Sequence, residues 1–176
     1  MSRRCFILLL VAMAMAAGIA PAPVPGDEPN EYKVKAAFVL KFIQFVEWPQ
    51  DASQKSIVVA TVGKDPFEGA LEQIVGGKQV GGKTIVVKHF GSGSEVEKCQ
   101  VMFVASESEG ELGKTLRKQG PGGLLTVGES DQFLSDGGVI RFYTQGGTLR
   151  FEISQEAAAK AQVQISAKLL RLAKPR

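Results

Sequence analysis

The segment at residues 32–49 constrains the fold most, because it combines helical spacing with an unusual density of large apolar side chains. It reads YKVKAAFVLKFIQFVEWP, with Asn30 as the expected N-cap and Trp48-Pro49 as the expected end. At about 100° per residue, one narrow stripe of this helix comprises Val34, Phe38, Phe42 and Phe45. Further aliphatic side chains spread over much of the remaining circumference. Such a helix must be covered on more than one side, by its own domain, a second copy or a partner.

The first two dozen residues are typical of a secretory signal. Arg3 and Arg4 are their only charges, and an almost unbroken apolar run over residues 5–17 follows, ending in small residues. The run is shorter than the roughly 20 residues that a membrane-spanning helix needs. Residues 1–20 are therefore predicted to be a signal peptide, and the mature protein is expected to be exported. An uncleaved N-terminal anchor is the alternative.

The small residues after the apolar run offer several cleavage sites. Cleavage after Ala16 is favoured, and cleavage after Ala20 or Ala22 is less favoured because a proline would follow. Residues 21–29, PAPVPGDEP, are predicted to be a flexible leader because they are rich in proline. The globular part is predicted to be a single domain over residues 30–176, long enough to bury a sizeable core.

The mature chain is nearly neutral and has one cysteine. The precursor has 21 basic and 18 acidic residues, so loss of Arg3 and Arg4 leaves 19 against 18, a net charge of +1. This balance gives no electrostatic footprint for nucleic acid. Cys99 has no partner for an internal disulfide once Cys5 is removed. It directly precedes an apolar strand and is predicted to be a buried small apolar residue, with pairing to a second chain as the alternative.

Behind the first helix, short apolar strands alternate with amphipathic helices. Strands are predicted at residues 56–62, 84–88, 100–105 and 124–127, and helices at residues 65–75, 94–98 and 109–119. Two segments of alternating pattern, 138–143 and 148–153, read as an antiparallel hairpin, and helices at 155–162 and 165–172 close the chain. The pattern predicts an α/β fold: a mostly parallel sheet flanked by helices, with a C-terminal antiparallel hairpin and closing helices.

The sequence contains no recognisable catalytic or metal-binding motif. His89 is the one histidine and is interpreted as an exposed loop residue. No GxSxG elbow, Walker loop or complete dinucleotide fingerprint occurs. The carboxylate pair Glu107 and Glu109 is interpreted as solvated surface. We therefore predict no enzymatic activity, no cofactor and no metal, with a hydrolase that uses only carboxylates as the open alternative.

Two surfaces are predicted to bind a partner. One lies on the aromatic helix and the other on the basic, partly apolar C-terminal segment. The predicted contact residues are Phe42, Phe45, Trp48, Lys168, Leu169, Arg171 and Leu172. In the alternative interpretation both helices bury their apolar stripes in their own fold, and the terminal bases complement the helix dipole.

The predicted sheet also offers a site for a small molecule. Ligands of open α/β sheets bind outside the carboxyl ends of the strands, which here lie near residues 63–65 and 105–107. A periplasmic small-molecule-binding sensor module is therefore the competing hypothesis from another class of function.

Six segments of the chain resemble the YfiR-like family in their order and spacing. They are YKVKAAFVLKFIQFVEWP, IVVATVGKDPFEGAL, LLTVGES, GGVIRFY, TLRFEI and ISAKLLRLAK. The resemblance extends from about residue 31 to residue 174. It implies a periplasmic α/β domain that is often a homodimer, and it supplies no catalytic motif.

The resemblance also implies a function. The best-understood member of the family binds the periplasmic sensor part of an inner-membrane diguanylate cyclase and restrains cyclic-di-GMP synthesis. An outer-membrane lipoprotein can draw that repressor away, and surface attachment and biofilm formation follow. That member resembles a disulfide-bonded scaffold. This chain departs from it because Cys99 has no partner for an internal disulfide. Redox control that depends on the family's disulfides is therefore not expected here, whereas a cyclase or another membrane sensor remains the expected partner.

Overall fold

The computed structural model describes residues 31–49, 54–120 and 122–174. Its helices are α1 (Glu31–Phe45), α2 (Ala70–Val75), the 3-10 helix η1 (Ser106–Glu111), α3 (Leu112–Gln119), α4 (Gln155–Lys160) and α5 (Ala167–Leu170). Its strands are β1 (Val46–Glu47), β2 (Ser56–Val62), β3 (Gln79–Val80), β4 (Lys83–Phe90), β5 (Val101–Val104), β6 (Leu125–Gly128), β7 (Ile140–Gln145), β8 (Thr148–Ile153) and β9 (Gln164–Ile165). The predicted signal peptide, the leader and the expected cap Asn30 lie outside the described residues.

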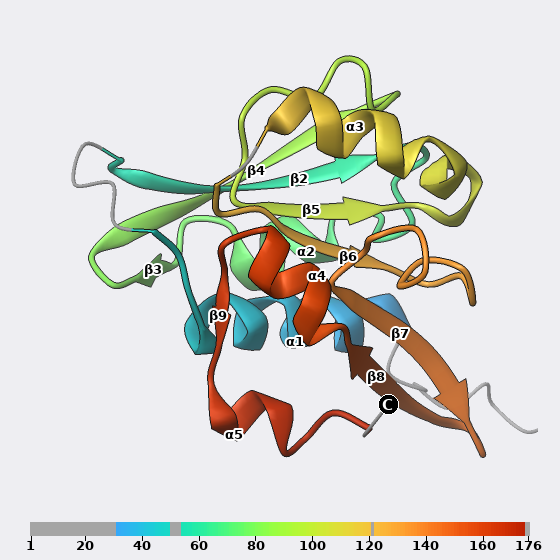
Figure 1. Ribbon diagram of the computed structural model, residues 1–176. Helices are drawn as coiled ribbons and strands as arrows, with labels where there is room; N and C mark the ends of the chain where they lie inside the picture. Colours follow the sequence, from blue (N-terminus) through green and yellow to red (C-terminus); the bar gives the residue numbers. More distant parts are fainter. Residues whose placement is uncertain (1–30, 50–53, 121, 175–176) are drawn as a thin grey trace, which may run out of the picture.

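Seven of the described strands form one sheet in the order β3-β4-β2-β5-β6-β7-β8. Neighbours from β4 to β7 pair in parallel, whereas β3 and β8 add antiparallel edges. The α1 and α2 helices lie on one side of the sheet and α3 on the other (Figure 1). The predicted fold class is confirmed. The five parallel strands follow the doubly wound order 2-1-3-4-5, in which the connections reverse direction between the first and third strands, here β2 and β5.

The first helix ends earlier than its apolar pattern predicts. It stops at Phe45 instead of at Trp48, because the next two residues form β1 and pair antiparallel with β9. Val46 opposes Ile165, and Glu47 opposes Gln164. This small sheet joins the N-terminal helix to the C-terminal end of the chain.

Most predicted strands are confirmed, but several predicted helices are shorter. The bounds of β2 match the prediction, whereas α2 starts only at Ala70 because Glu68 and Gly69 adopt positive φ angles of 50° and 83°. Turns replace the helix predicted at residues 94–98. The last helix starts after Ser166, whose hydroxyl accepts the Leu169 N–H at 3.3 Å, since the preceding residues belong to β9.

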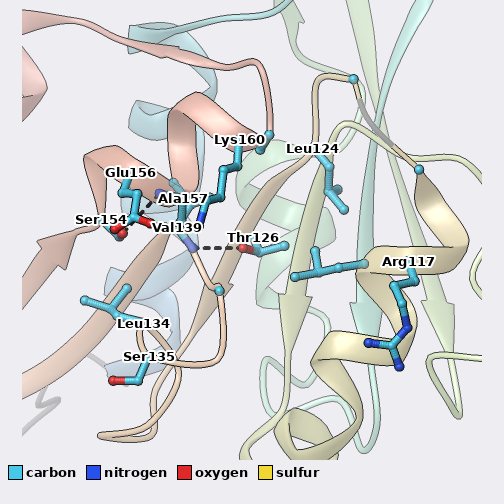
Figure 2. Close-up of a pocket in the computed structure, with 15 residues that line it drawn as sticks. Arg117, Leu124, Thr126, Leu134, Ser135, Val139, Ser154, Glu156, Ala157 and Lys160 are labelled. Carbon is cyan, nitrogen blue, oxygen red and sulfur yellow. Dashed lines mark hydrogen bonds and ion pairs between the residues drawn. The ribbon is translucent and has the colours of Figure 1, made fainter.

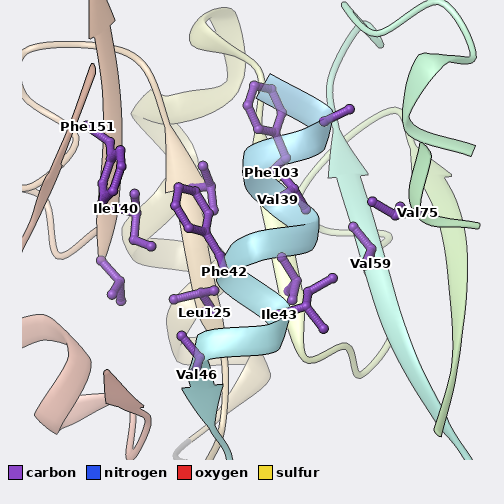
Figure 3. Close-up of a cluster of buried hydrophobic side chains, with 14 of the residues drawn as sticks. Val39, Phe42, Ile43, Val46, Val59, Val75, Phe103, Leu125, Ile140 and Phe151 are labelled. Atoms are coloured by element: carbon purple, nitrogen blue, oxygen red, sulfur yellow. The ribbon is translucent and has the colours of Figure 1, made fainter. Parts of the chain in front are cut away.

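The larger core lies between α1 and the sheet. Figure 3 shows Val39, Phe42, Ile43 and Val46 among Val59, Val75, Phe103, Leu125, Ile140 and Phe151. Phe42 is fully buried, and its ring stacks on Phe142 at 5.5 Å and meets Phe151 edge-on at 5.2 Å. The apolar excess of the first helix is therefore covered by its own sheet.

A smaller core lies on the other side of the sheet. It contains Met102, Phe133 and the inner side of α3, and also Cys99, which is buried as predicted. The Phe133 ring fits between two glycines: an added Cβ would approach it to 2.3 Å at Gly128 and 2.2 Å at Gly138. Because these two glycines have no side chain, the Phe133 ring can pack between them and hold the loop between β6 and β7 against the sheet.

Candidate partner surface and ligand crevice

The structure divides the predicted contact residues into buried and accessible ones. Phe42 and Leu169 are 0% and 1% exposed. Neither offers surface to a partner in this conformation, so both must be removed from the predicted site. Their apolar side chains pack in the larger core, as the alternative interpretation of the two helices proposes.

The end of α1 and the start of α5 are neighbours. The Ser166 N–H donates to the Phe45 carbonyl at 3.0 Å, and the Lys168 ammonium lies 5.0 Å from the centre of the Phe45 ring. A cation at this distance from an aromatic face is attracted by it. The fold thus places side by side two predicted contact residues that are 123 positions apart in the sequence.

The C-terminal turn exposes a large apolar side chain. Leu172 is 66% exposed, and the next most exposed large apolar residue of the described chain, Val86, is 39% exposed. Arg171 directly precedes Leu172, Lys168 lies four residues before it, and both are exposed. We call Phe45, Lys168, Arg171 and Leu172 the α1–α5 surface. Its combination of positive charge and unburied leucine suits an acidic partner with an apolar contact point.

Trp48 occupies a different place from the α1–α5 surface. It follows β1 at the end away from α5, and its indole N–H donates to the Gln100 carbonyl at 3.3 Å. Its ring also packs close to Gly123, where an added Cβ would lie 3.3 Å from Cδ1. These contacts give Trp48 a role inside the fold, and its predicted role in binding a partner stays a prediction.

A crevice lies at the carboxyl ends of β2 and β5, where the doubly wound order reverses. Its volume is about 360 Å³, within the usual range for ligand pockets. The residues that line it are Tyr32, Lys64, Asp65, Pro66, Glu68, Ala105, Ser106, Glu107 and Glu129. Residues 64–65 and 105–107, which directly follow the two strands, line the crevice. The predicted position of the crevice is therefore confirmed.

A buried lysine lies beside this crevice. Lys35 forms ion pairs with Glu129 and, at 2.6 Å, with Glu31, while the Tyr32 hydroxyl donates to Glu129 at 3.3 Å. Burial lowers the pKa of Lys35, but its hydrogen bonds to Glu129 and Glu31 outweigh burial and the pKa is raised overall. Burial and the Glu129 charge raise the pKa of Tyr32. Lys35, Glu31, Glu129 and Tyr32 thus form one network of ion pairs and hydrogen bonds at the start of α1.

Glu109 is a structural anchor of the crevice and not a solvated residue. It is 5% exposed and accepts the N–H groups of Glu129, at 2.7 Å, and Ser130. Its predicted companion Glu107 is exposed, and accepts the Lys64 N–H at 2.8 Å. Hydrogen bonds from its own N–H and that of Lys64 lower the pKa of Glu107. The interpretation of the pair as solvated surface is therefore wrong for Glu109, whose carboxylate fixes the loop after β6.

His89 lies within β4 and not in a loop, so that part of its interpretation is wrong, whereas its predicted exposure is confirmed. Its Nδ1 is 2.5 Å from the Thr61 hydroxyl, and its Nε2 contacts the Glu72 carboxylate. Because a carboxylate only accepts, Nε2 donates, and in the neutral ring Nδ1 accepts from Thr61. Thr61, His89 and Glu72 are thus arranged like the nucleophile, base and orienting acid of a catalytic triad. Thr61, however, is 1% exposed, so a substrate could not reach its hydroxyl in this conformation. The network joins β2, β4 and α2.

No group of three or more histidine, cysteine, aspartate or glutamate side chains that suits a metal ion occurs in the described part of the chain. Among the same residues, no helix is both long and apolar enough to cross a lipid bilayer.

The fold defines an α/β domain with a doubly wound sheet. The chain belongs to the YfiR/HmsC-like family, whose profile matches residues 32–174. No curated protein matches the chain. The family suggests that the protein regulates diguanylate cyclase signalling.

Proposed function

We propose that this protein is a periplasmic regulator that binds and restrains the periplasmic sensor part of an inner-membrane diguanylate cyclase. Membership of the YfiR/HmsC-like family supports the signalling theme. The observation that supports a binding role most directly is the exposed Leu172, flanked by cationic side chains at the end of a folded domain. The protein needs no catalytic activity for this role, and its occupancy of the sensor lowers cyclic-di-GMP and biofilm formation.

The proposed mechanism is a shift between two states of the partner. The sensor equilibrates between inactive and active arrangements, and this protein binds the inactive one more tightly. A competitor, such as an outer-membrane lipoprotein, or an envelope signal lowers the occupancy and releases the cyclase. The size of the effect is set by the difference in affinity for the two states, and a tenfold difference corresponds to about 1.4 kcal/mol.

The α1–α5 surface is the proposed contact site for the sensor. We expect Leu172→Glu to weaken binding at least tenfold, because it places a carboxylate where an apolar side chain meets an acidic partner. The matched control is Val86→Glu, which changes the other exposed large apolar residue, on β4. In a strain that lacks the chromosomal gene, only the Leu172 variant should raise cyclic-di-GMP and biofilm formation. Equal effects of both variants would reject the assignment of the contact site.

Photocrosslinking tests the partner directly. A photoreactive residue in place of Leu172 should capture an inner-membrane protein with a periplasmic sensor, whereas the same residue in place of Lys114, exposed on α3, should not. Capture of a membrane receptor without a cyclase domain would keep the regulatory role and replace the partner. Homodimer contacts would appear as crosslinked pairs of this chain.

The crevice between β2 and β5 favours a second candidate function, a periplasmic small-molecule-binding sensor. Its position at the reversal of the doubly wound order is the usual ligand position in such sheets. The test is thermal unfolding with a panel of periplasmic metabolites. Saturable stabilisation that is lost in Ser106→Trp, together with failure of the photocrosslinking experiment, would favour the sensor over the partner-binding role.

A further inference from the structure

A further cavity lies away from both sites already described. Its volume is about 580 Å³, and it opens between α3 and α4. Figure 2 shows Arg117 on the α3 side and Glu156, Ala157 and Lys160 on the α4 side, with Leu124 and Thr126 between them. It contains no residue of the α1–α5 surface and none of the crevice beside Lys35.

The cavity exists because the sheet opens between β6 and β7. The two strands pair at only two positions, Val127 with Ile140 and Gly128 with Arg141. Before this point the Val139 N–H donates instead to the Thr126 hydroxyl at 2.9 Å. The C-terminal end of α4 closes the gap from the side, where the Gly123 N–H donates to the Ala161 carbonyl at 2.8 Å.

The chemistry of the walls differs between the floor and the rim. Most of the floor is apolar and consists of Leu116, Leu124, Leu134, Val139, Ala157 and Ala161, while Thr126, Ser135 and Ser154 add polar groups to the lining. On the rim, Lys160 is paired with Glu156 at 2.7 Å. Arg117 is exposed and forms no ion pair or hydrogen bond with any described residue. The α3 side of the rim therefore carries one positive charge that no described acidic residue pairs, with its guanidinium lying along α3 near Gly113 (Figure 2).

We propose that this cavity binds a small amphipathic carboxylate, with its apolar body on the floor and its carboxylate at Arg117. The planar guanidinium can donate two parallel hydrogen bonds to a carboxylate, which fixes the orientation of the ligand. Because Arg117 is exposed, most of the affinity comes from burial of the apolar body, and the charge selects anions over neutral analogues. A volume of about 580 Å³ suits a medium-length acyl chain or a single aromatic ring system.

Four probes that share parts of one structure test the ligand class. Octanoate combines the chain and the carboxylate, 1-octanol has the chain without the charge, octyltrimethylammonium reverses the charge, and acetate has no chain. We expect saturable binding of octanoate by titration calorimetry, about fivefold weaker binding of octanol, and no measurable binding of the other two. Equal affinities for octanoate and octanol, or no saturable binding of octanoate, would overturn the proposal.

Two variants locate the site on the intact mature chain. Arg117→Gln should reduce octanoate affinity to that of octanol and leave octanol unchanged, whereas Arg171→Gln, on the α1–α5 surface, should change neither. Ala161→Phe should fill the cavity and abolish binding of both. If Ala161→Phe does not fold, amide chemical shifts of the wild-type protein decide: octanoate must perturb α3, α4 and residues 124–139. Perturbations centred elsewhere would place the ligand at another site and reject the proposal.

Discussion

The α1 and α5 helices, both predicted from their apolar residues to meet a partner, differ in how much of that surface the fold uses. The buried residues of α1 are Lys35, Ala36, Val39, Phe42 and Ile43. The only buried residue of α5 is Leu169, and the turn after it leaves Leu172 exposed. Apolar density alone therefore does not separate core from contact surface. The position of the helix against the sheet does, since α1 lies on the sheet whereas α5 is a single turn beside α1, farther from the sheet (Figure 1).

The largest effect should come from the inner side of α1. Phe42→Ala should lower the free energy of unfolding by about 4 kcal/mol, because it removes a fully buried ring from a cluster of aromatic side chains. Chemical denaturation measures the change. Phe45→Ala on the same helix is the matched control and should cost clearly less, because Phe45 is only partly buried. Equal losses would contradict the division of α1 into an inner and an outer side.

The inner side of α5 should matter almost as much, despite the shortness of the helix. Leu169→Ala should destabilise the protein by about 3 kcal/mol, since Leu169 is 1% exposed and packs in the same core as α1. The measurement is the denaturation midpoint in urea. A loss below about 1 kcal/mol would mean that α5 is detached in solution, and the comparison with α1 would then fail.

The charged start of α1 provides a smaller effect that depends on pH. Lys35→Ala should cost about 2 kcal/mol, because it leaves the Glu129 carboxylate without its cation, whereas Lys33→Ala on the exposed side should change stability little. Since the folded-state pKa of Lys35 is raised, its contribution is complete below the unfolded pKa of 10.5 and is lost as pH rises through the folded pKa.

The pH dependence separates this ion pair from simple packing. The stability difference between wild type and Lys35→Ala should be constant from about pH 7 to pH 9 and should shrink as pH rises above the unfolded pKa of 10.5. Urea titrations across this range measure the difference. A difference that does not change with pH would show that Lys35 acts through its hydrocarbon chain.

The sequence predicts most strands of the sheet well, because each of them is marked by a local pattern of apolar and β-branched residues. Residues 56–62 form an apolar, largely β-branched run, and their strand has the predicted bounds. The end of α1 could not be predicted, because Val46 turns into a strand only through its pairing with Ile165, at the other end of the chain. Glu109 was misjudged for a related reason: its burial depends on the N–H groups of a loop that follows a different strand. Local composition does not reveal such partners.

The same limit applies to the candidate sites. The crevice at residues 63–65 and 105–107 was predictable, because parallel strands bring their carboxyl ends to one edge of the sheet. The cavity between α3 and α4 was not predictable, since it depends on β6 and β7 pairing over only two positions. Nothing in either strand's sequence marks where their pairing begins.

The smallest effect on stability should come from the outer side of the C-terminal turn. Leu172→Ala should change the free energy of unfolding by less than about 0.5 kcal/mol, because the side chain is 66% exposed and removing it opens no cavity. The same variant should nevertheless weaken binding to the sensor several-fold if Leu172 is the apolar contact point of the α1–α5 surface. Comparison with Leu169→Ala, three residues earlier, separates stability from binding along one short segment. Leu169 should govern stability, and Leu172 should govern binding. If Leu172→Ala destabilises as much as Leu169→Ala, the turn packs against the core in solution and cannot serve as the contact site.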